Sequence, residues 1–285
     1  MQIHIIGSGT PDAKKNRSGS AYVLEIGEEM ILVDCGPGTT YKMGCMELDH
    51  SKVQHLFLTH HHFDHNVDLA NFALVWWDQM GAPPAPLSIY GPPPTEAFVD
   101  KLLGSDGAFS DDWKARVDLP ASQILHQQRG GALPRPAPMD AMVVKDISPG
   151  FTMQTERWAV TALWCHHAEP TLDSLMYRFD TAEGSVLFTG DAGACPELTD
   201  ACREVDHIVI CCAYPGEIHP DIGHVVTGAP AVVEIASQSK AKTMILGHQN
   251  AAVTSPKGRE ETLAKIGAAF GGTVTFGDEL TTHTL

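Results

Sequence analysis

The chain has no long apolar run, few cysteines and no basic leader, and each absence excludes a class of protein. Its 285 residues contain no apolar stretch near the ~20 residues that a membrane span needs. The N-terminal MQIHIIGSGTP has neither the basic start nor the apolar core of a signal peptide. Seven cysteines, an odd number without a CxxC pair, do not suit a disulfide framework. We therefore expect a reduced, cytoplasmic protein with no membrane attachment.

Basic residues are also scarce. Lysine and arginine together number 19 against 35 aspartates and glutamates, which gives a formal net charge of -16. Nucleic-acid binding depends on basic side chains that neutralise phosphates, and the densest basic run, Lys14-Lys15-Asn16-Arg17, is short. The charge therefore argues against a nucleic-acid partner, and we expect a small-molecule substrate and a homodimer.

Apolar periodicity predicts strands and helices in an order typical of two packed sheets with helices outside. Short β-rich runs dominate the first third of the chain, and both halves begin with strands and continue with alternating strands and helices. The predicted strands are 3–9, 21–27, 30–36, 53–60, 87–93, 158–165, 174–181, 185–191, 207–215, 242–249 and 272–278, and the predicted helices are 68–80, 95–104, 229–239 and 258–270.

The segment of about 105–150 differs from its surroundings. It is rich in proline and glycine, as in RGGALPRPAPMD, and its apolar periodicity is weak. A long segment of this kind within a compact domain is often functional. We expect one domain over 1–285 in which about 105–150 is an insertion, loop or lid.

The stretch LTHHHFDHNVDL, Leu58 to Leu69, holds four of the 15 histidines and an aspartate within six positions. Histidine is a poor helix former and a poor core residue, but its neutral ring is the commonest metal ligand. In an extended chain His60 and His62 point to the same face, whereas His61 points away. Asp64 and His65 follow in the turn before a helix, near enough to serve a neighbouring ion. The pattern HxHxDH predicts a site for two metal ions.

Further ligand-type residues stand where other predicted strands end. WAVTALWC is followed by His166 and His167, one of which is expected to complete an ion with His60 and His62. SVLFTG is followed by Asp191, and a carboxylate after a buried run is costly unless it is paired or binds a metal. TMILG is followed by His248. The chain thus offers seven ligands for two ions.

These motifs resemble the metallo-β-lactamase fold, and in particular its ribonuclease Z and arylsulfatase-like branch. The similarity covers most of the chain outside 105–150 and rests on HxHxDH at His60 to His65, the aspartate at Asp191, the late His248, GSGTP at Gly7 to Pro11, LVDCGPGT at Leu32 to Thr39, YGPP at Tyr90 to Pro93 and YRFDTAEGSVLFTGD. The resemblance implies an α/β fold (α+β in some schemes) with four layers, αββα. It also implies two zinc ions, with manganese or iron as alternatives, and assigns the ligand role to His167 rather than His166.

The resemblance implies roles for residues around the metals. It gives metal ligands His60, His62, Asp64, His65, His167, Asp191 and His248. Asp34 is expected to orient a ligand histidine from behind. Asp64 is expected to orient a metal-bound hydroxide or take its proton. His224, with His219 as its rival, is expected to be a general acid or oxyanion stabiliser, although relatives carry HxT where this chain reads His224-Val-Val-Thr227.

The expected activity is hydrolysis by a metal-bound hydroxide. The bond is of the ester type (phosphodiester, sulfate, carboxyl ester or lactone), since such a site stabilises any developing oxyanion. The alternative is a tRNA 3′-processing endonuclease, ribonuclease Z. A diiron redox protein is disfavoured because His62 is not the glutamate that those members carry, and a non-catalytic module because no ligand is missing. Trp76 and Trp77 either line a substrate pocket or belong to the core.

Overall fold

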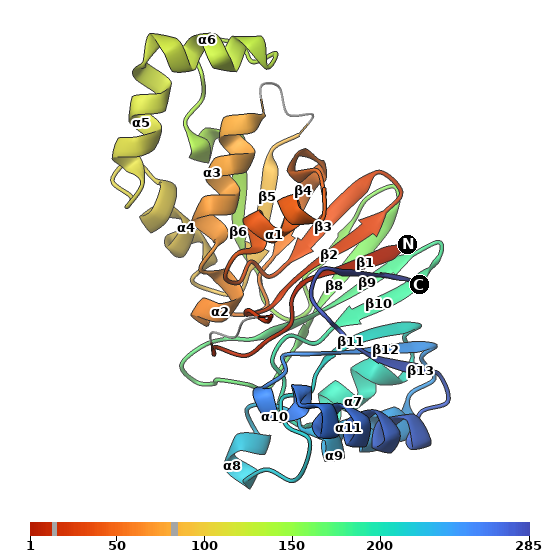
Figure 1. Cartoon of the computed structure of the whole chain (residues 1–285). Helices are drawn as coiled ribbons and strands as arrows, with labels where there is room; N and C mark the ends of the chain where they lie inside the picture. The colour runs from red at the N-terminus through yellow and green to blue at the C-terminus, as the bar shows by residue number, and fades with distance from the viewer. Residues whose placement is uncertain (13–15, 81–84) are drawn as a thin grey trace.

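Two seven-stranded sheets form the centre of the molecule, which the computed structural model describes over residues 1–12, 16–80 and 85–285 (Figure 1). The first sheet has the order β14-β1-β2-β3-β4-β5-β6 and the second the order β13-β12-β11-β10-β9-β8-β7. The strands of the first sheet are β1 (Gln2–Gly7), β2 (Ala21–Ile26), β3 (Glu29–Val33), β4 (Val53–Phe57), β5 (Leu87–Gly91), β6 (Met142–Asp146) and β14 (Thr281–Thr284). Those of the second are β7 (Thr152–Gln154), β8 (Trp158–Trp164), β9 (Leu175–Thr181), β10 (Gly184–Phe188), β11 (His207–Cys211), β12 (Thr243–Gly247) and β13 (Thr273–Phe276).

Helices cover the outer face of each sheet. On the first sheet lie α1 (Thr39–Cys45), α2 (Phe63–Asn66), α3 (Leu69–Gln79) and α4 (Thr95–Leu103). Along the second run α7 (Pro196–Arg203), α8 (Pro220–Gly223), α9 (Ala229–Gln238), α10 (Ala251–Thr254) and α11 (Pro256–Ala269). One buried cluster, which includes Phe57 and Phe179, fills the space between the sheets, and two others lie under the helices. The predicted four-layer αββα sandwich is confirmed.

The strand directions bring the predicted site residues to one edge of the sandwich. Strands β3 to β6 run parallel, and so do β10 to β13. Because β8 and β10 are both antiparallel to β9, they too run in the same direction. The loops that follow β4, β8, β10 and β12 therefore emerge close together, which is where functional residues gather in sheets of this kind.

The segment of about 105–150 is more regular than its sequence indicated. It contains α5 (Ser110–Asp118), α6 (Pro120–Gln128), a 3-10 helix (Pro138–Ala141) and β6, which pairs with β5. Each of the two α-helices buries a single residue, Trp113 in α5 and His126 in α6, so neither shows a clear apolar stripe. Figure 1 shows α5 and α6 at the far end of the first layer from α8 and α10. A role as an insertion or lid stays a prediction.

Asp78, at the end of α3, holds this helical arm to the body. Its carboxylate lies 3.6 Å from Arg116, 3.4 Å from Arg129 and 3.0 Å from Arg135. The guanidinium of Arg135 also lies over the ring of Trp77, 3.7 Å from its centroid. One carboxylate thus pairs with three arginines. These ion pairs attach the segment of about 105–150 to α3 and neutralise part of its positive charge.

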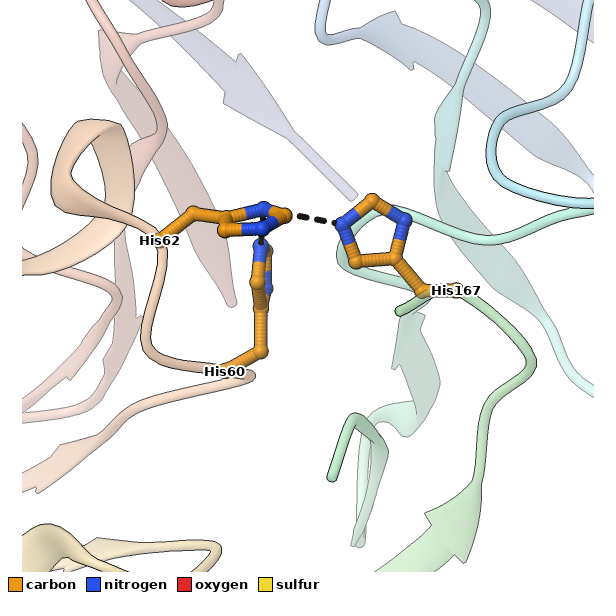
Figure 2. A group of neighbouring side chains, drawn as sticks. All are labelled: His60, His62 and His167. Carbon is orange, nitrogen blue, oxygen red and sulfur yellow. Dashed lines mark hydrogen bonds between the residues drawn. The ribbon is translucent and has the colours of Figure 1, made fainter. Parts of the chain in front are cut away.

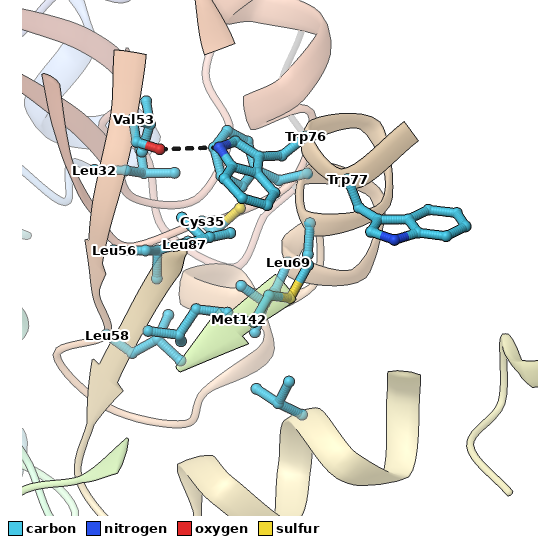
Figure 3. Close-up of a cluster of buried hydrophobic side chains, with 14 of the residues drawn as sticks. Leu32, Cys35, Val53, Leu56, Leu58, Leu69, Trp76, Trp77, Leu87 and Met142 are labelled. Carbon is cyan, nitrogen blue, oxygen red and sulfur yellow. Dashed lines mark hydrogen bonds between the residues drawn. The ribbon is translucent and has the colours of Figure 1, made fainter. Parts of the chain in front are cut away.

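Trp76 and Trp77 belong to the core rather than to a pocket. Both are buried, with exposed fractions of 1% and 3%. Trp76 packs under β3 and β4 and donates its indole N–H to the carbonyl of Val53 (Figure 3), and Trp77 donates to the carbonyl of Pro136. Within the described ranges, no helix has the length and apolar character that a membrane crossing requires.

Candidate metal centre

Three histidine rings from the two halves of the chain converge on one point. Figure 2 shows His60 and His62, from the loop after β4, facing His167, from the loop after β8. Nδ1 of His62 lies 3.0 Å from Nε2 of His60 and 3.0 Å from Nε2 of His167. Each histidine offers one nitrogen, and the three nitrogens lie within 4.8 Å of one another. This is the arrangement that a tetrahedral ion with three imidazole ligands requires.

A second group stands beside the first. Asp64, His65 and His248 also bring one ligand atom each to within 4.8 Å of the others. Asp191 connects the two groups: its Oδ2 lies 2.9 Å from Nε2 of His248 and 3.9 Å from Nε2 of His167, while its Oδ1 lies 3.4 Å from Nε2 of His65. A carboxylate so placed faces both groups.

Unpaired polar atoms at this point test whether the donors suit a metal. Oδ1 of Asp64, Nε2 of His65 and Oδ1 of Asp191 are buried and have no hydrogen-bond partner in the described part of the chain. Buried groups without partners are unfavourable, and a cation between them would satisfy all three at once. Imidazole nitrogens and carboxylate oxygens are also ligands that zinc prefers. The cluster therefore fits a metal centre.

The pKa directions within the cluster match its ligand chemistry. Burial lowers the pKa of His60 well below its usual value, and the neighbouring His65 adds to the effect, so its ring is neutral and able to bind a metal. Burial alone would raise the pKa of Asp191, but His248 and His65 hold it well below its ordinary range, so it stays ionised. The pKa of His65 is about 10, because Asp191 and Asp34 outweigh its burial, and Asp191 likewise raises the pKa of His248 well above the usual value.

We predict that metal uptake at about neutral pH releases at least one proton per chain. Without metal, His65 and His248 keep their protons because their pKa values are raised, whereas a ligand nitrogen must be deprotonated. Affinity should therefore weaken as the pH falls. Calorimetric titration with zinc in two buffers of different ionisation enthalpy measures the number released. Uptake without proton release at about pH 7 would contradict this assignment.

Asp34 orients His65 from behind. It follows β3 with a positive φ of 60°, a conformation that aspartate adopts more readily than most residues. Its Oδ2 accepts a hydrogen bond of 2.7 Å from Nδ1 of His65, which leaves Nε2 of that ring facing Asp64 and Asp191. Its Oδ1 accepts from the backbone N–H of Thr59 at 2.7 Å. The arrangement fixes the ring and its tautomer, as expected for Asp34.

The remaining histidines of the motifs lie outside the metal-type groups. Nε2 of His61 donates to the carbonyl of Pro92 at 3.1 Å, so this ring points away from the cluster, as its place in the run predicts. His166 lies beside His224, with ring centroids 5.9 Å apart. His219 is exposed and lies 3.5 Å from Asp221.

Cys211 is a site neighbour that the sequence did not reveal. At the end of β11, it brings its sulfur into a further metal-type group with Asp191 and His248. In the sequence it stands in a fully apolar run and is indistinguishable from a small core residue. Only the pairing of β11 with β12, which aligns Cys211 with Gly247, brings it beside His248.

Comparison with known proteins places this geometry in a family. Residues 15–248 match the model of the metallo-beta-lactamase superfamily, which is most of the chain. The chain belongs to the metallo-β-lactamase superfamily. Its predicted family and hydrolase class are confirmed.

Relatives that match along nearly their whole length show which members of the superfamily this chain is similar to. The chain is 24% identical over 289 residues to a protein named Ribonuclease Z from Mycobacterium marinum, with 98% of this chain and 97% of that protein covered. It is 26% identical to the Ribonuclease Z of Mycobacterium avium, at 98% and 96% coverage. Among solved structures, the metallo-beta-lactamase fold protein YhfI from Bacillus subtilis has a TM-score of 0.72 at 16% identity, with 99% of both chains covered. Human tRNase Z, short form, has a TM-score of 0.69 at 17% identity, with 100% and 99% covered.

These relatives overturn the expected partner. From the net charge we expected a small-molecule substrate and argued against nucleic acid, and that expectation is wrong, because the full-length relatives are named for action on RNA. The physical reason is that the net charge is a sum over the whole surface, whereas the binding of a nucleic acid depends on the positive side chains near one site. Lys14 and Lys15 of the basic run lie outside the described residues.

Proposed function

We propose that this protein is a binuclear metal-dependent RNA phosphodiesterase of the ribonuclease Z type, a tRNA 3′-processing endonuclease. The observation that carries the proposal is the position of Asp191 between a three-histidine group and an Asp64–His65–His248 group, in a chain with full-length relatives named Ribonuclease Z. Two zinc ions are the proposed occupants, held by His60, His62, Asp64, His65, His167, Asp191 and His248.

The chain's own groups suit an in-line displacement at phosphorus. When bound, two divalent cations neutralise the phosphate charge and lower the pKa of water towards about 7. Asp64, one of the proposed ligands, would also orient the attacking water, because its carboxylate has lone pairs that can accept a hydrogen bond in addition to those that hold a cation. Although burial alone would raise the pKa of Asp64, its hydrogen bond with His248 keeps that pKa low and the carboxylate ionised.

Local cations beside the site support an RNA substrate despite the acidic chain. A cavity of about 700 Å³ is lined by Gln249, which follows the ligand His248, and by Arg17, Lys42 and Arg259. Asp278 and Glu279 in the same wall pair with these cations and leave one positive charge in excess. A cavity wall with a net positive charge suits a phosphate backbone better than the average surface of this acidic chain does.

His224 is the proposed donor to the leaving oxygen. It stands after α8, next to Val225, whose carbonyl accepts a hydrogen bond of 2.6 Å from Nδ1 of His167. His224→Ala should keep both metals and lower kcat by about 10²–10⁴-fold, because only proton transfer in the transition state is removed. Metal content and steady-state kinetics measure the two effects. Loss of metal, or an unchanged kcat, would show that His224 has another role; His219→Ala is the matched control.

The proposal is tested with a labelled tRNA precursor that carries a 3′ trailer. The zinc-loaded protein should cut it at a single position near the end of the acceptor stem. Asp64→Asn should abolish the cut, whereas His61→Ala, a change in the same run at a side chain that faces away, should retain it. If the precursor stayed intact with zinc, manganese and iron, the proposed function would be rejected. Equal cutting by Asp64→Asn would reveal a contaminating nuclease.

A further inference from the structure

A small cavity that shares no lining residue with the cation-lined one lies between segments of the two sheets. Its volume is about 110 Å³, roughly ten times the ~10–15 Å³ that one water molecule needs. Residues from both halves of the chain line it: Pro92, Ser148 and Pro149 from loops, Trp164 from the end of β8, and Asp173 and Ser174 from the loop before β9. Nothing in the mechanism above uses these residues.

Hydrogen bonds tie the walls of this cavity to the loops that carry the metal ligands. Pro92 accepts from His61, the residue between the ligands His60 and His62. Leu175, also in the wall, donates its backbone N–H to the carbonyl of Thr59 at 2.9 Å. Trp164 ends β8, three residues before the ligand His167. A group held in the cavity is therefore adjacent to the reaction centre.

The hydroxyl of Ser174 indicates that the cavity binds a ligand. Its side chain is buried, with an exposed fraction of 2%, and its hydroxyl has no hydrogen-bond partner in the described part of the chain. A buried hydroxyl is normally paired, so the absence of a partner at a cavity wall indicates that the partner comes from a bound molecule. The exposed carboxylate of Asp173 next to it adds a hydrogen-bond acceptor.

Trp164 supplies a flat aromatic wall. It is 37% exposed, whereas the other four tryptophans are buried, with exposed fractions of 8% or less. Its ring lies 5.5 Å from that of His166, and His166 in turn contacts His224. The three rings form an aromatic strip from the cavity to the proposed proton donor.

We propose that this cavity binds one unpaired nucleobase of the RNA substrate, with a preference for bases that carry an amino group. The inference rests on the proposed function. Nucleobases stack on exposed aromatic rings whatever their identity. Hydrogen bonds to the edge of the base then determine which base is preferred. An exocyclic amino group donates to the Asp173 carboxylate, as it does to acidic residues elsewhere. The neighbouring edge of the ring pairs with the Ser174 hydroxyl. Cytosine, adenine and guanine each carry the amino donor and a neighbouring ring nitrogen for the hydroxyl, whereas uracil lacks the amino donor.

Direct binding tests the proposal independently of cleavage. The probes are CMP, AMP, UMP and ribose 5-phosphate, titrated into the zinc-loaded protein while tryptophan fluorescence is followed. CMP and AMP should quench the exposed Trp164 and bind more tightly than UMP, and ribose 5-phosphate should not quench it. Trp164→Leu should weaken CMP binding by about 5- to 100-fold, the loss expected for one stacked base. Asp173→Ala should remove the preference of CMP over UMP, and Ser174→Ala should weaken the binding of both.

A matched control and a second readout separate this role from a structural one. Phe109 is another exposed aromatic residue, 40% exposed at the start of α5, and Phe109→Leu should leave binding unchanged. Trp164→Phe, which keeps a ring, should restore most of the affinity. In precursor cleavage, Trp164→Leu should raise KM with metal content unchanged.

Equal binding of CMP by wild type, Trp164→Leu and Ser174→Ala, or equal quenching by ribose 5-phosphate, would overturn the inference. Quenching by CMP without any cleavage of RNA would reject the proposed function but keep the base site.

Discussion

Asp191→Asn should leave the protein without either metal ion and lower RNA cleavage by about 10³-fold or more, a loss of ~4 kcal/mol of transition-state stabilisation. The carboxylate faces both ligand groups, with Oδ1 towards His65 and Oδ2 towards His248 and His167. An amide keeps the shape but removes the negative charge that holds two cations close together. Metal analysis of the purified variant, beside kinetics, measures both effects.

The matched control is Asp206→Asn. Asp206 pairs with Lys242 just before β11, at the opposite end of the same sheet from Asp191. Because Asp206 also accepts hydrogen bonds from the backbone N–H and the hydroxyl of Ser185, at 2.9 and 3.0 Å, this substitution should lower the free energy of unfolding by about 1–2 kcal/mol. It should leave the metal content unchanged. If Asp191→Asn kept one full metal equivalent, the carboxylate would belong to a single ion rather than to both.

His167→Ala should remove the ion held with His60 and His62, and His166→Ala should not. Nε2 of His167 lies 3.0 Å from Nδ1 of His62 within the three-histidine group. The side chain of His166 instead turns towards Glu169, with its Nδ1 3.3 Å from the carboxylate. We expect His167→Ala to hold about one equivalent of metal and to lose activity by about 10²-fold or more.

The adjacent positions make this pair of variants a controlled comparison. Both substitutions remove an imidazole from one short loop, so any general loosening of the loop affects both proteins. His65 and His248 remain, and the second ion should therefore persist in each. Greater loss of metal from His166→Ala than from His167→Ala would reverse the ligand assignment.

The chain order of the site residues made much of this centre predictable. His60, His62, Asp64 and His65 lie within six positions, so local geometry alone decides which rings share a face. Asp191 and His248 were recognisable because each polar residue follows a buried strand. The choice between His166 and His167 needed the family resemblance, since both follow β8 and the periodicity of the strand does not extend into the loop.

Features that depend on tertiary contacts were missed. Cys211 comes beside His248 through strand pairing, which leaves no mark in an apolar run. The helices α5 and α6 were obscured because each buries one side chain and is attached largely by arginines that converge on Asp78. The net charge gave the wrong partner because it is a sum over the whole chain and does not show that Arg17, Lys42 and Arg259 lie together in one cavity wall.

The spread of the ligands along the chain sets the moment at which the site can exist during synthesis. The first ligand is His60 and the last is His248, and they meet only after the second sheet has formed beside the first. A growing chain released from the ribosome as far as β10 would present His60, His62 and His167 but lack Asp191, His248 and β11, the parallel neighbour of β10. Domains fold as units during synthesis. The nascent protein should therefore gain the second of the proposed ions, and with it the proposed RNA-cleaving activity, only when its last quarter has emerged.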